Sequence, residues 1–514
     1  MGQLDFGPLH ADFYAFTMGD ALFRAGDINK NTTFQSFIRK PPFGGSYLIT
    51  AGLQVWLDWL KDWAFTDAHL AYLRAQTYAD GTPLFSEGYL DWLRDSPLQI
   101  DVTVLAEGEL AFTNTPIAII HGPVGQCLIV EAMLLNIINS QSLIATVASR
   151  CRLVAGDDPM VEGGLRRAQD TGGFGPTRAA FIGGFNATSN TAAAFALGIP
   201  VKGTFAHAYV TFHATEGEAF NNYATHMPVA PSFLVDTYNT LNGVKTAIEA
   251  CKAHGIKPGA IRLDSGDLGW LSQQAKNLLV DAGFPDTKIV ASNDLDAHSI
   301  AALKQQQKEG NAHIDMWLVG TNVVTAAEQP ALGGVYKLVE VDGRKVIKVA
   351  ERTTVGTDSK TTIPGAHMAI RYLRDTPLGR QWYGDTILPE DKVQSLVTRA
   401  ERNPDGTYIL PESIISVDLN DPERPKEFPA GTTFIVPYKE VMKNGREIDG
   451  RDTLPEIQKR VAKNLGMLAP EHKRLNKPHV YVSGIEEELY DERRHMIRDI
   501  HLATRKSLSQ AKAA

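Results

Sequence analysis

The chain contains very little cysteine and no excess of basic residues. Its three cysteines, Cys127, Cys151 and Cys251, are too few and too scattered over 514 residues for a disulfide framework or a four-ligand zinc site. Lysine and arginine number 51 against 59 acidic residues, and the formal net charge is −8. Such a chain has no basic field to hold a nucleic acid, although a few arginines in one cleft suffice to bind a small phosphorylated molecule.

The sequence also lacks an uninterrupted apolar segment of membrane-spanning length. Its amino terminus, MGQLDFGPLHADFY, has no basic segment followed by an apolar run, as a secretory signal would have. The longest apolar stretch, 117–138, contains His121, Gly122, Pro123 and Glu131, which are unfavourable at membrane depth. We therefore expect a cytoplasmic protein with no membrane partner, in which this stretch forms a buried strand and helix.

The pattern of apolar residues divides the chain into three regions. Residues 1–140 mix helical stretches with strand candidates such as TFQSFI and QIDVTVLAEG, which is typical of an α+β domain, and we expect about 350–410 to complete it. Between 141 and 349, short apolar runs end in small polar motifs and are followed by helical stretches. This alternation predicts parallel strands with covering helices in an α/β barrel or barrel-like sheet. Residues 411–514 are expected to form a carboxyl-terminal extension.

Four motifs in the middle region carry polar residues where a strand is expected to end. They are VKGTFAHA, AIRLDSGDL, KIVASNDLD and DMWLVGTNVV. The carboxyl ends of parallel strands meet at one face of such a fold, and substrate binds at that face. Each motif alone is common in α/β proteins, whereas their joint occurrence on successive strand ends favours a functional site.

His207 and the pair Asp264 and Asp267 are the groups in these motifs best suited to chemistry. A single histidine after an apolar run is more often a hydrogen-bonded structural residue. The two carboxylates suit Mg²⁺ or ribose hydroxyls, and the alternative is a tight turn in which Asp267 caps a helix. Arg262 lies two residues before Asp264 and therefore on the same face of the strand. Its guanidinium can bind a substrate carboxylate through two parallel hydrogen bonds or neutralise the aspartates.

Other residues in the same region offer groups for phosphate. Asn293 follows the third motif's strand, and the turn of Gly320 and Thr321 offers backbone amides and a hydroxyl. The segment GLRRAQ contributes Arg166 and Arg167, for which a solvated helix face is the alternative. The glycine-rich FIGGFNATSN is either a phosphate-binding turn or a plain strand-to-helix turn. No GxxxxGK[ST] motif occurs, so the chain has no Walker nucleotide site.

Taken together, these motifs resemble one family. Ten segments occur in the order seen in nicotinate phosphoribosyltransferases: DFYAFTM, FIRKPPFGG, GLRRAQ, FIGGFNATSN, GTFAHAYV, IRLDSGDL, ASND, VGTNVVT, ALGGVYKLV and TTIPG. The match runs from about Asp12 to Gly365, with weaker likeness further on. The resemblance implies a type II phosphoribosyltransferase fold, which is an irregular α/β barrel with an amino-terminal α+β domain, in a homodimer with shared active sites.

The resemblance also implies an activity. Members of this family transfer the 5-phosphoribosyl group of phosphoribosyl pyrophosphate to nicotinate, giving nicotinate mononucleotide and pyrophosphate, in the first step of NAD salvage from nicotinic acid. The transfer uses Mg²⁺ and is coupled to ATP hydrolysis through a phosphohistidine. The resemblance thus implies a phosphoprotein that is both a glycosyltransferase and a ligase.

Residue by residue, the resemblance makes His207 the phosphohistidine and places Thr204 at the nicotinate. Tyr14 is expected to stack on the pyridine ring from the neighbouring subunit, and Arg262 to bind the nicotinate carboxylate. Two further groups are implied: for phosphoribosyl pyrophosphate, Thr362, Asn293, Arg166 or Arg167, Gly320 and Thr321; for Mg²⁺ and the ribose, Asp264 and Asp267.

One position departs from the family pattern. Ala208 follows His207, where the commoner pattern GT(L/M)AHS has a serine, and this bears on the hydrogen bond that orients the imidazole. Two alternative functions stay open, a nicotinamide or quinolinate phosphoribosyltransferase and a non-catalytic nucleotide-binding barrel. A Schiff-base aldolase is a third hypothesis, which needs a lysine inside the barrel, with Lys202 and Lys337 as candidates.

Overall fold

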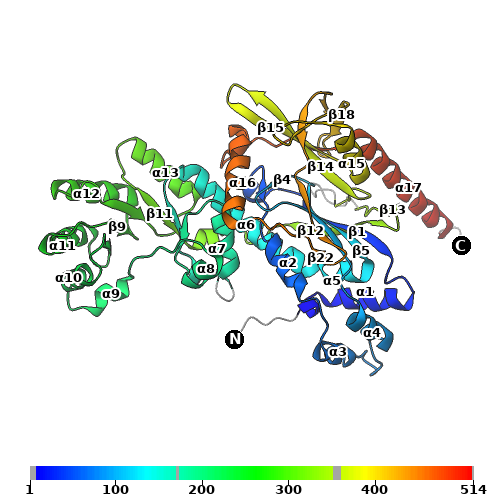
Figure 1. Cartoon of the computed structure of the whole chain (residues 1–514), viewed down its shortest axis with the longest axis horizontal. Coiled ribbons are helices and arrows are strands. Elements are labelled where there is room, and N and C mark those ends of the chain that lie inside the picture. Colours follow the sequence, from blue (N-terminus) through cyan, green and yellow to red (C-terminus); the bar gives the residue numbers. More distant parts are fainter. Residues whose placement is uncertain (1–6, 170–172, 351–359, 512–514) are drawn as a thin grey trace. The chain divides into compact units, whose positions relative to one another are not determined.

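The computed structural model describes residues 7–169, 173–350 and 360–511 (Figure 1). The chain forms two compact units. Unit 1 comprises 1–139, 332–452 and 463–514, and unit 2 comprises 140–331 and 453–462. Unit 2 is thus largely an insertion in the sequence of unit 1.

Unit 2 is built on a parallel sheet, which has six strands in the part of the chain that the structure describes. Their spatial order is β7 (Ala187–Thr188), β6 (Met160–Glu162), β11 (Met316–Val319), β10 (Lys288–Ala291), β9 (Ala260–Leu263) and β8 (Ser232–Leu234). Every neighbouring pair is parallel. The sheet is curled, and because β7 and β8 are its two edges it is a half-barrel and not a closed barrel. This confirms the predicted parallel, barrel-like architecture.

Helices alternate with these strands because the segments after the strands carry good N-cap residues. Asn190, Asn239, Asp267 and Asp296 each accept a hydrogen bond from the backbone N–H three residues further on, which begins α8, α11, α12 and α13. The helices are α7 (Phe174–Ile182), α8 (Thr191–Leu197), α9 (His207–Phe212), α10 (Glu216–His226), α11 (Thr240–Ala253), α12 (Leu268–Asp281), α13 (Ala297–Lys308) and α14 (Thr321–Val324).

Unit 1 contains two larger sheets. The first has the order β13 (Arg344–Lys345), β12 (Gly334–Val341), β1 (Asn31–Ile38), β5 (Pro116–Pro123), β3 (Asp101–Leu105), β21 (Tyr438–Lys443) and β22 (Arg446–Glu447). The second has the order β16 (Glu401–Arg402), β17 (Tyr408–Ile409), β20 (Thr433–Ile435), β14 (His367–Thr376), β15 (Gly379–Pro389), β23 (Ser483–Glu486), β18 (Ile414–Val417) and β19 (Lys426–Phe428). The short strands β2 (Leu48–Ile49) and β4 (Leu110–Ala111) pair with each other.

The helices of unit 1 are α1 (Phe13–Arg24), α2 (Leu53–Lys61), α3 (Asp67–Arg74), α4 (Glu87–Asp95), α5 (Val124–Ile129), α15 (Glu390–Arg399) and α17 (Glu487–Ala511). Two more, α6 (Glu131–Ala155) and α16 (Leu454–Met467), run across unit boundaries in the sequence. The predicted strands TFQSFI and QIDVTVLAEG correspond to β1 and β3.

The sequence-based domain boundaries differ from this division in two places. Residues 332–349, expected in the barrel, lie in unit 1 because β12 pairs along its length with β1. Residues 411–514 do not form an appended extension, because most of their strands complete the sheets of unit 1. β21 pairs with β3 of the first sheet, and β18, β20 and β23 belong to the second. Local pattern does not reveal such distant pairing.

The long apolar stretch 117–138 forms β5, α5 and the start of α6, as predicted. Among the described residues, α6 is the one helix that is long and apolar enough to cross a membrane by composition. In the structure, 61% of its most apolar window is buried. This burial is what a core helix of a folded protein shows.

The hairpin of β14 and β15 is anchored by a fully buried ion pair in unit 1. Arg371 and Asp385 are both 0% exposed, and Arg371 Nη2 lies 2.9 Å from Asp385 Oδ2. Tyr481 donates to Asp385 Oδ1 (2.9 Å), and Arg371 donates to the carbonyl of Leu110 (2.6 Å). The guanidinium also lies over the Phe112 ring. A buried charge that loses its partner is strongly destabilising, so these contacts tie distant segments of unit 1 together.

We expect Asp385→Ala to lower the free energy of unfolding by about 3–5 kcal/mol, because it leaves the Arg371 guanidinium buried without its carboxylate. The measurement is a urea titration followed by tryptophan fluorescence. Asp375→Ala is the matched control: its carboxylate pairs with Arg380 on the same hairpin but is 80% exposed, and the unfolding midpoint should stay that of the wild type. Equal midpoints for the two variants would show that the buried pair is unimportant.

Candidate active site

The carboxyl ends of the parallel strands in unit 2 bring a set of polar side chains together. Asp236 follows β8, Asp264 follows β9 and Ser292 follows β10. Ser265 donates to Asp236 Oδ2 (2.5 Å), and the backbone N–H of Asp264 donates to the same oxygen (3.1 Å). Ser292 donates to Asp264 Oδ1. The ends of β8, β9 and β10 are therefore connected by side chains as well as by the backbone ladder.

Arg262 lies in the middle of this set. Along β9 the side chains of Ile261 and Leu263 are buried, and Arg262 alternates with them and points to the other face. Its Nε donates to Ser292 Oγ (3.0 Å), its Nη1 to Thr204 Oγ1 (3.3 Å) and its Nη2 to Asp264 Oδ1 (3.0 Å). The predicted common face of Arg262 and Asp264 is confirmed by this contact. A guanidinium has five N–H groups, so one on each terminal nitrogen is left for a ligand.

His207 joins the same set but not from a strand end. The segment VKGTFAHA, expected as a strand, makes only an isolated bridge between Val201 and Thr188, and His207 is the first residue of α9. The expectation of four strand ends was wrong here, because the two-residue edge strand β7 offers this segment a partner at Thr188 alone and the residues after Val201 run on to α9 without further pairing. The imidazole Nδ1 lies 3.1 Å from Thr237 Oγ1, and the side chain is 42% exposed.

Asp236 is a site residue that the sequence analysis missed. Its carboxylate is 1% exposed, and its Oδ1 has no hydrogen-bond partner although it is buried. This oxygen lies 3.8 Å from His207 Nε2, and Asp264 Oδ2 lies at the same distance from that nitrogen. The signal was present in the sequence, since SFLVD is a short apolar run that ends in an acid, like the motifs that were recognised.

Two other predicted residues stand at strand ends with different roles. The Asp267 carboxylate accepts from the backbone N–H of Trp270 (3.1 Å) and caps α12, as the alternative had it. Asn293 follows β10 and, with Asp294, has a positive φ, 84° and 45° respectively. Two successive left-handed residues that are not glycine are strained, and such strain concentrates at functional sites.

The arginine turn, which we define as Gly163–Arg167, follows β6 and is held by a buried carboxylate. Glu162 is 1% exposed and accepts hydrogen bonds from the hydroxyls of Thr177 (2.9 Å) and Thr188 (2.6 Å) and from the backbone N–H of Gly164. Arg166 and Arg167 lie in a 3₁₀ turn, and both are exposed.

This turn also packs on the neighbouring strand end. A Cβ at Gly164 would lie 2.5 Å from Val324 Cγ1 of α14, the helix that Gly320 and Thr321 begin. Only glycine fits at that approach. The two predicted phosphate-binding segments of unit 2 therefore lie side by side.

Tyr14 and Thr362 belong to unit 1. Tyr14, on α1, is 46% exposed, and its phenol donates to Glu131 Oε2 (3.1 Å). Partial burial and then the negative Glu131 raise the pKa of Tyr14 well above its ordinary value, so the phenol stays protonated. Thr362 is 3% exposed; its hydroxyl accepts from the backbone N–H of Lys348 (3.0 Å), and its carbonyl accepts from Arg493 (3.0 Å).

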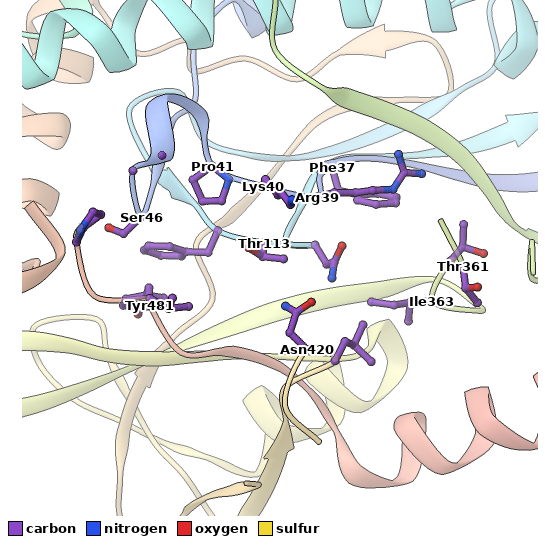
Figure 2. A pocket seen from close by; sticks show the side chains of 18 of the residues that line it. Phe37, Arg39, Lys40, Pro41, Ser46, Thr113, Thr361, Ile363, Asn420 and Tyr481 are labelled. Atoms are coloured by element: carbon purple, nitrogen blue, oxygen red, sulfur yellow. The ribbon is translucent and has the colours of Figure 1, made fainter. Parts of the chain in front are cut away.

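Thr362 also lines a cavity of about 340 Å³ within unit 1. Figure 2 shows the segment after β1, which carries Arg39 and Lys40, at one side of this cavity and Asn420 at another. Arg493 lines it as well, and no aspartate or glutamate does among the described residues. In a chain with net charge −8, such a lining is suited to an anion.

The candidate site offers two carboxylates, which is only part of a ligand set for the expected Mg²⁺. The described residues contain no group of three or more His, Cys, Asp or Glu side chains that could hold a metal ion by themselves. Asp236 and Asp264 nevertheless turn one carboxylate oxygen each toward the same side of His207, and that of Asp236 has no hydrogen-bond donor. This fits a cation that takes its remaining ligands from water and substrate phosphates, as Mg²⁺ commonly does.

Comparison with known proteins gives a consistent result. The family model described as the nicotinate phosphoribosyltransferase N-terminal domain matches residues 9–139, and the C-terminal domain of the same family matches 400–493. The nicotinate phosphoribosyltransferase of Bacillus subtilis is 35% identical, with 96% of this chain and 95% of that protein covered.

Solved structures agree. The crystal structure of human nicotinic acid phosphoribosyltransferase is similar with a TM-score of 0.77 and 26% identity, covering 94% of this chain and 99% of that one. The nicotinate-nucleotide pyrophosphorylase of Pyrococcus furiosus, at 19% identity, shares the fold with a TM-score of 0.64, covering 90% and 96%.

The curled parallel sheet and its companion α+β unit therefore form the fold of the type II phosphoribosyltransferases. Within that class, the chain belongs to the nicotinate phosphoribosyltransferase family.

We expect Glu162→Ala to loosen the arginine turn, because two hydroxyls and one N–H lose their buried acceptor, at about 1–3 kcal/mol for each unsatisfied group. Limited trypsin digestion, with the cleavage after Arg166 and Arg167 followed by mass spectrometry, should show at least about tenfold faster cleavage there. Glu218→Ala, which removes an exposed carboxylate at the start of α10, should leave that rate unchanged. Unchanged cleavage in Glu162→Ala would mean that the turn is held by packing alone.

Proposed function

We propose that this protein transfers the 5-phosphoribosyl group of phosphoribosyl pyrophosphate to nicotinate, giving nicotinate mononucleotide and pyrophosphate. Its membership of the family supports the reaction. The observation that carries the choice of substrate is Arg262, whose guanidinium is held on three sides by Thr204, Ser292 and Asp264 with two N–H groups to spare. A fixed guanidinium matches a carboxylate in two parallel hydrogen bonds, and nicotinate has a carboxylate where nicotinamide has an amide.

The chemistry of the transfer suits the other groups at these strand ends. Breaking the bond to pyrophosphate builds positive charge on the ribose and negative charge on the leaving group, so catalysis depends on positioning and electrostatics more than on a nucleophile. Arg166 or Arg167 and the turn of Gly320 and Thr321 are proposed to bind the phosphates, and Asn293 the ribose phosphate unit. Thr362 is proposed as a phosphoribosyl pyrophosphate ligand on the resemblance, supported by the cationic lining of its cavity.

The proposal includes Mg²⁺, which when bound would neutralise the charge that develops on the phosphates. Asp264 is the first candidate ligand. Asp236 is proposed as the second in place of Asp267, because the Asp267 carboxylate caps α12 whereas Asp236 has a buried oxygen without a donor.

ATP coupling is proposed to run through phosphorylation of His207. The imidazole lies beside the carboxylates of Asp236 and Asp264, which could hold a cation next to a phosphate on the ring. Phosphorylated His207 would add an anionic group that orders the surrounding loops. From its membership of the family we also propose that the protein acts in NAD salvage, in the cytoplasm. We further propose a homodimer in which Tyr14 reaches the partner's nicotinate site; Tyr14 is half-exposed on α1, as such a role requires.

The other hypotheses have less support. A nicotinamide phosphoribosyltransferase does not require a guanidinium that forms two parallel hydrogen bonds with a carboxylate. A non-catalytic barrel does not require Asp236 and Asp264 beside His207. An aldolase needs a lysine within the parallel sheet, but Lys337 lies on β12 of unit 1 and Lys202 is exposed outside any strand.

The purified protein with Mg²⁺ should form nicotinate mononucleotide from nicotinate, with kcat/KM at least about 10²-fold above that for nicotinamide, because the amide cannot accept both hydrogen bonds. Chromatography of the products with the two substrates in parallel measures this. Arg262→Lys should lower kcat/KM for nicotinate by about 10²-fold, since lysine cannot form the fork. Lys288→Gln, at the exposed amino end of β10, is the control and should behave as the wild type. Equal use of nicotinamide would refute the assignment of the substrate.

His207→Ala should abolish ATP stimulation and acid-labile phosphate on the protein, while keeping a basal rate of transfer, because in the proposed mechanism the histidine serves the ATP step alone. Incubation with γ-labelled ATP, followed by acid and base stability tests, measures the phosphate. His213→Ala is the control, because in the wild type the His213 imidazole is hydrogen-bonded to the carbonyl of Tyr209 (2.8 Å). This variant should be labelled like the wild type. Label that persists in His207→Ala would place the phosphohistidine elsewhere.

A further inference from the structure

The turn after β10 has a strained backbone. Asn293 and Asp294 have φ values of 84° and 45°, in the left-handed region where the Cβ of a side chain is crowded by the backbone. Both residues are exposed, so burial of their side chains does not hold them in this conformation. A strained turn persists only where the structure around it leaves it no alternative. The contacts of the neighbouring residues therefore determine where Asn293 lies.

The chain is fixed on both sides of this turn. Ser292, before it, is buried and donates to the Asp264 carboxylate. Leu295, after it, is 2% exposed, and Asp296 caps α13 by accepting a hydrogen bond from the backbone N–H of Ser299 (2.6 Å). The two strained residues thus connect two fixed points of the chain over a short distance.

Asn322, from the neighbouring strand end, also bonds to this turn. Its Nδ2 donates to the carbonyl of Asp294 (2.7 Å) and to that of Leu295 (3.2 Å). The helical hydrogen bonds of α13 begin at the carbonyl of Asp296, so these two carbonyls precede the helical ladder. Asn322 directly follows Thr321 at the start of α14, after β11. One side chain thereby connects the loops after β10 and β11.

We infer that Asn322 is a positioning residue for the binding of a sugar phosphate, and that it acts by holding the strained turn of Asn293. The inference rests on the proposed function, in which Asn293 binds the ribose phosphate unit and the turn of Gly320 and Thr321 binds phosphate. The Asn322 amide fixes the separation of these two loops, and a ligand bound by both needs that separation to be correct.

This role distinguishes two classes of ligand. Phosphoribosyl pyrophosphate and ribose 5-phosphate carry both a sugar and a phosphate, so they contact the loop of Asn293 and the phosphate turn together. Pyrophosphate has no sugar and does not depend on the loop of Asn293. Loss of the Asn322 amide should therefore weaken the binding of the first class and leave that of pyrophosphate nearly unchanged.

The test compares the full-length wild type with Asn322→Ala, which removes the amide, and Asn322→Leu, which keeps its volume but has no donor. Isothermal titration calorimetry with Mg²⁺ measures the Kd of phosphoribosyl pyrophosphate, ribose 5-phosphate and pyrophosphate for each protein. In both variants we expect the Kd of the two sugar phosphates to rise about tenfold and that of pyrophosphate to change less than about twofold. In steady-state assays the KM for phosphoribosyl pyrophosphate should rise likewise, and the KM for nicotinate should not.

Asn277→Ala is the matched control. Asn277 is an exposed asparagine on α12 whose side chain accepts from Gln273 (3.1 Å), and its loss should leave all three Kd values unchanged. The ratio of Kd values between ligands is measured on one protein sample. Partial unfolding lowers the number of binding sites and not this ratio, so a variant of reduced stability still gives a result.

The outcomes separate this inference from the function on which it rests. Equal weakening of all three ligands in Asn322→Ala, or of none, overturns the role of Asn322 and leaves the transfer reaction intact. Wild-type affinities in Asn322→Leu also overturn it, because the side chain would then act through its volume and not through its N–H groups. A wild type that binds the sugar phosphates but makes no nicotinate mononucleotide overturns the proposed function, while the ratio still tests Asn322.

Discussion

The alternation of side chains along β9 is the constraint on which the candidate site depends. Because Ile261 and Leu263 are buried, Arg262 must point to the opposite face, and Asp264 two residues on shares that face. Arg262 and Asp264 are hydrogen-bonded to the neighbouring strand ends. Ser292 accepts from Arg262 and donates to Asp264, and the backbone N–H of Asp264 donates to Asp236. A shift of the register of β9 by one residue would turn the Arg262 side chain into the core, and its hydrogen bonds to Thr204, Ser292 and Asp264 would be lost. The register of one four-residue strand thus determines which groups can meet His207.

Much of this arrangement could be predicted from local pattern, because short apolar runs followed by polar motifs identify parallel strands and their functional ends. The common face of Arg262 and Asp264 needed only the period of a strand, and the capping role of Asp267 was one of two stated alternatives. Asp236 and the helical start at His207 were not predicted. The first has only a three-residue strand before it. The second follows a segment that pairs with the short edge strand β7 at a single position, and local pattern does not report how long a neighbouring strand is.

The limits of unit 1 were harder to predict for a similar reason. Its sheets are assembled from strands far apart in the sequence, so the segments that look like loops and a tail by composition are parts of its framework. Arg371 and Asp385 illustrate this. A single ion pair on one hairpin contacts Leu110 and Tyr481, which lie hundreds of positions apart along the chain, and fixes them in one core. Contacts of this kind depend on tertiary pairing, and hydropathy alone does not report them.

The insertion of unit 2 into the sequence of unit 1 has a consequence for the order of events on the ribosome. β3 is translated early. Its partner β21, whose Tyr438 pairs with Leu105 of β3, is translated only after every strand of the parallel sheet. At ~5–20 residues per second this delay is on the order of tens of seconds. The parallel sheet is thus complete in the nascent chain while the edge of β3 is still unpaired. Such an edge is open to pairing with other chains, so the growing polypeptide must protect it until β21 has been made.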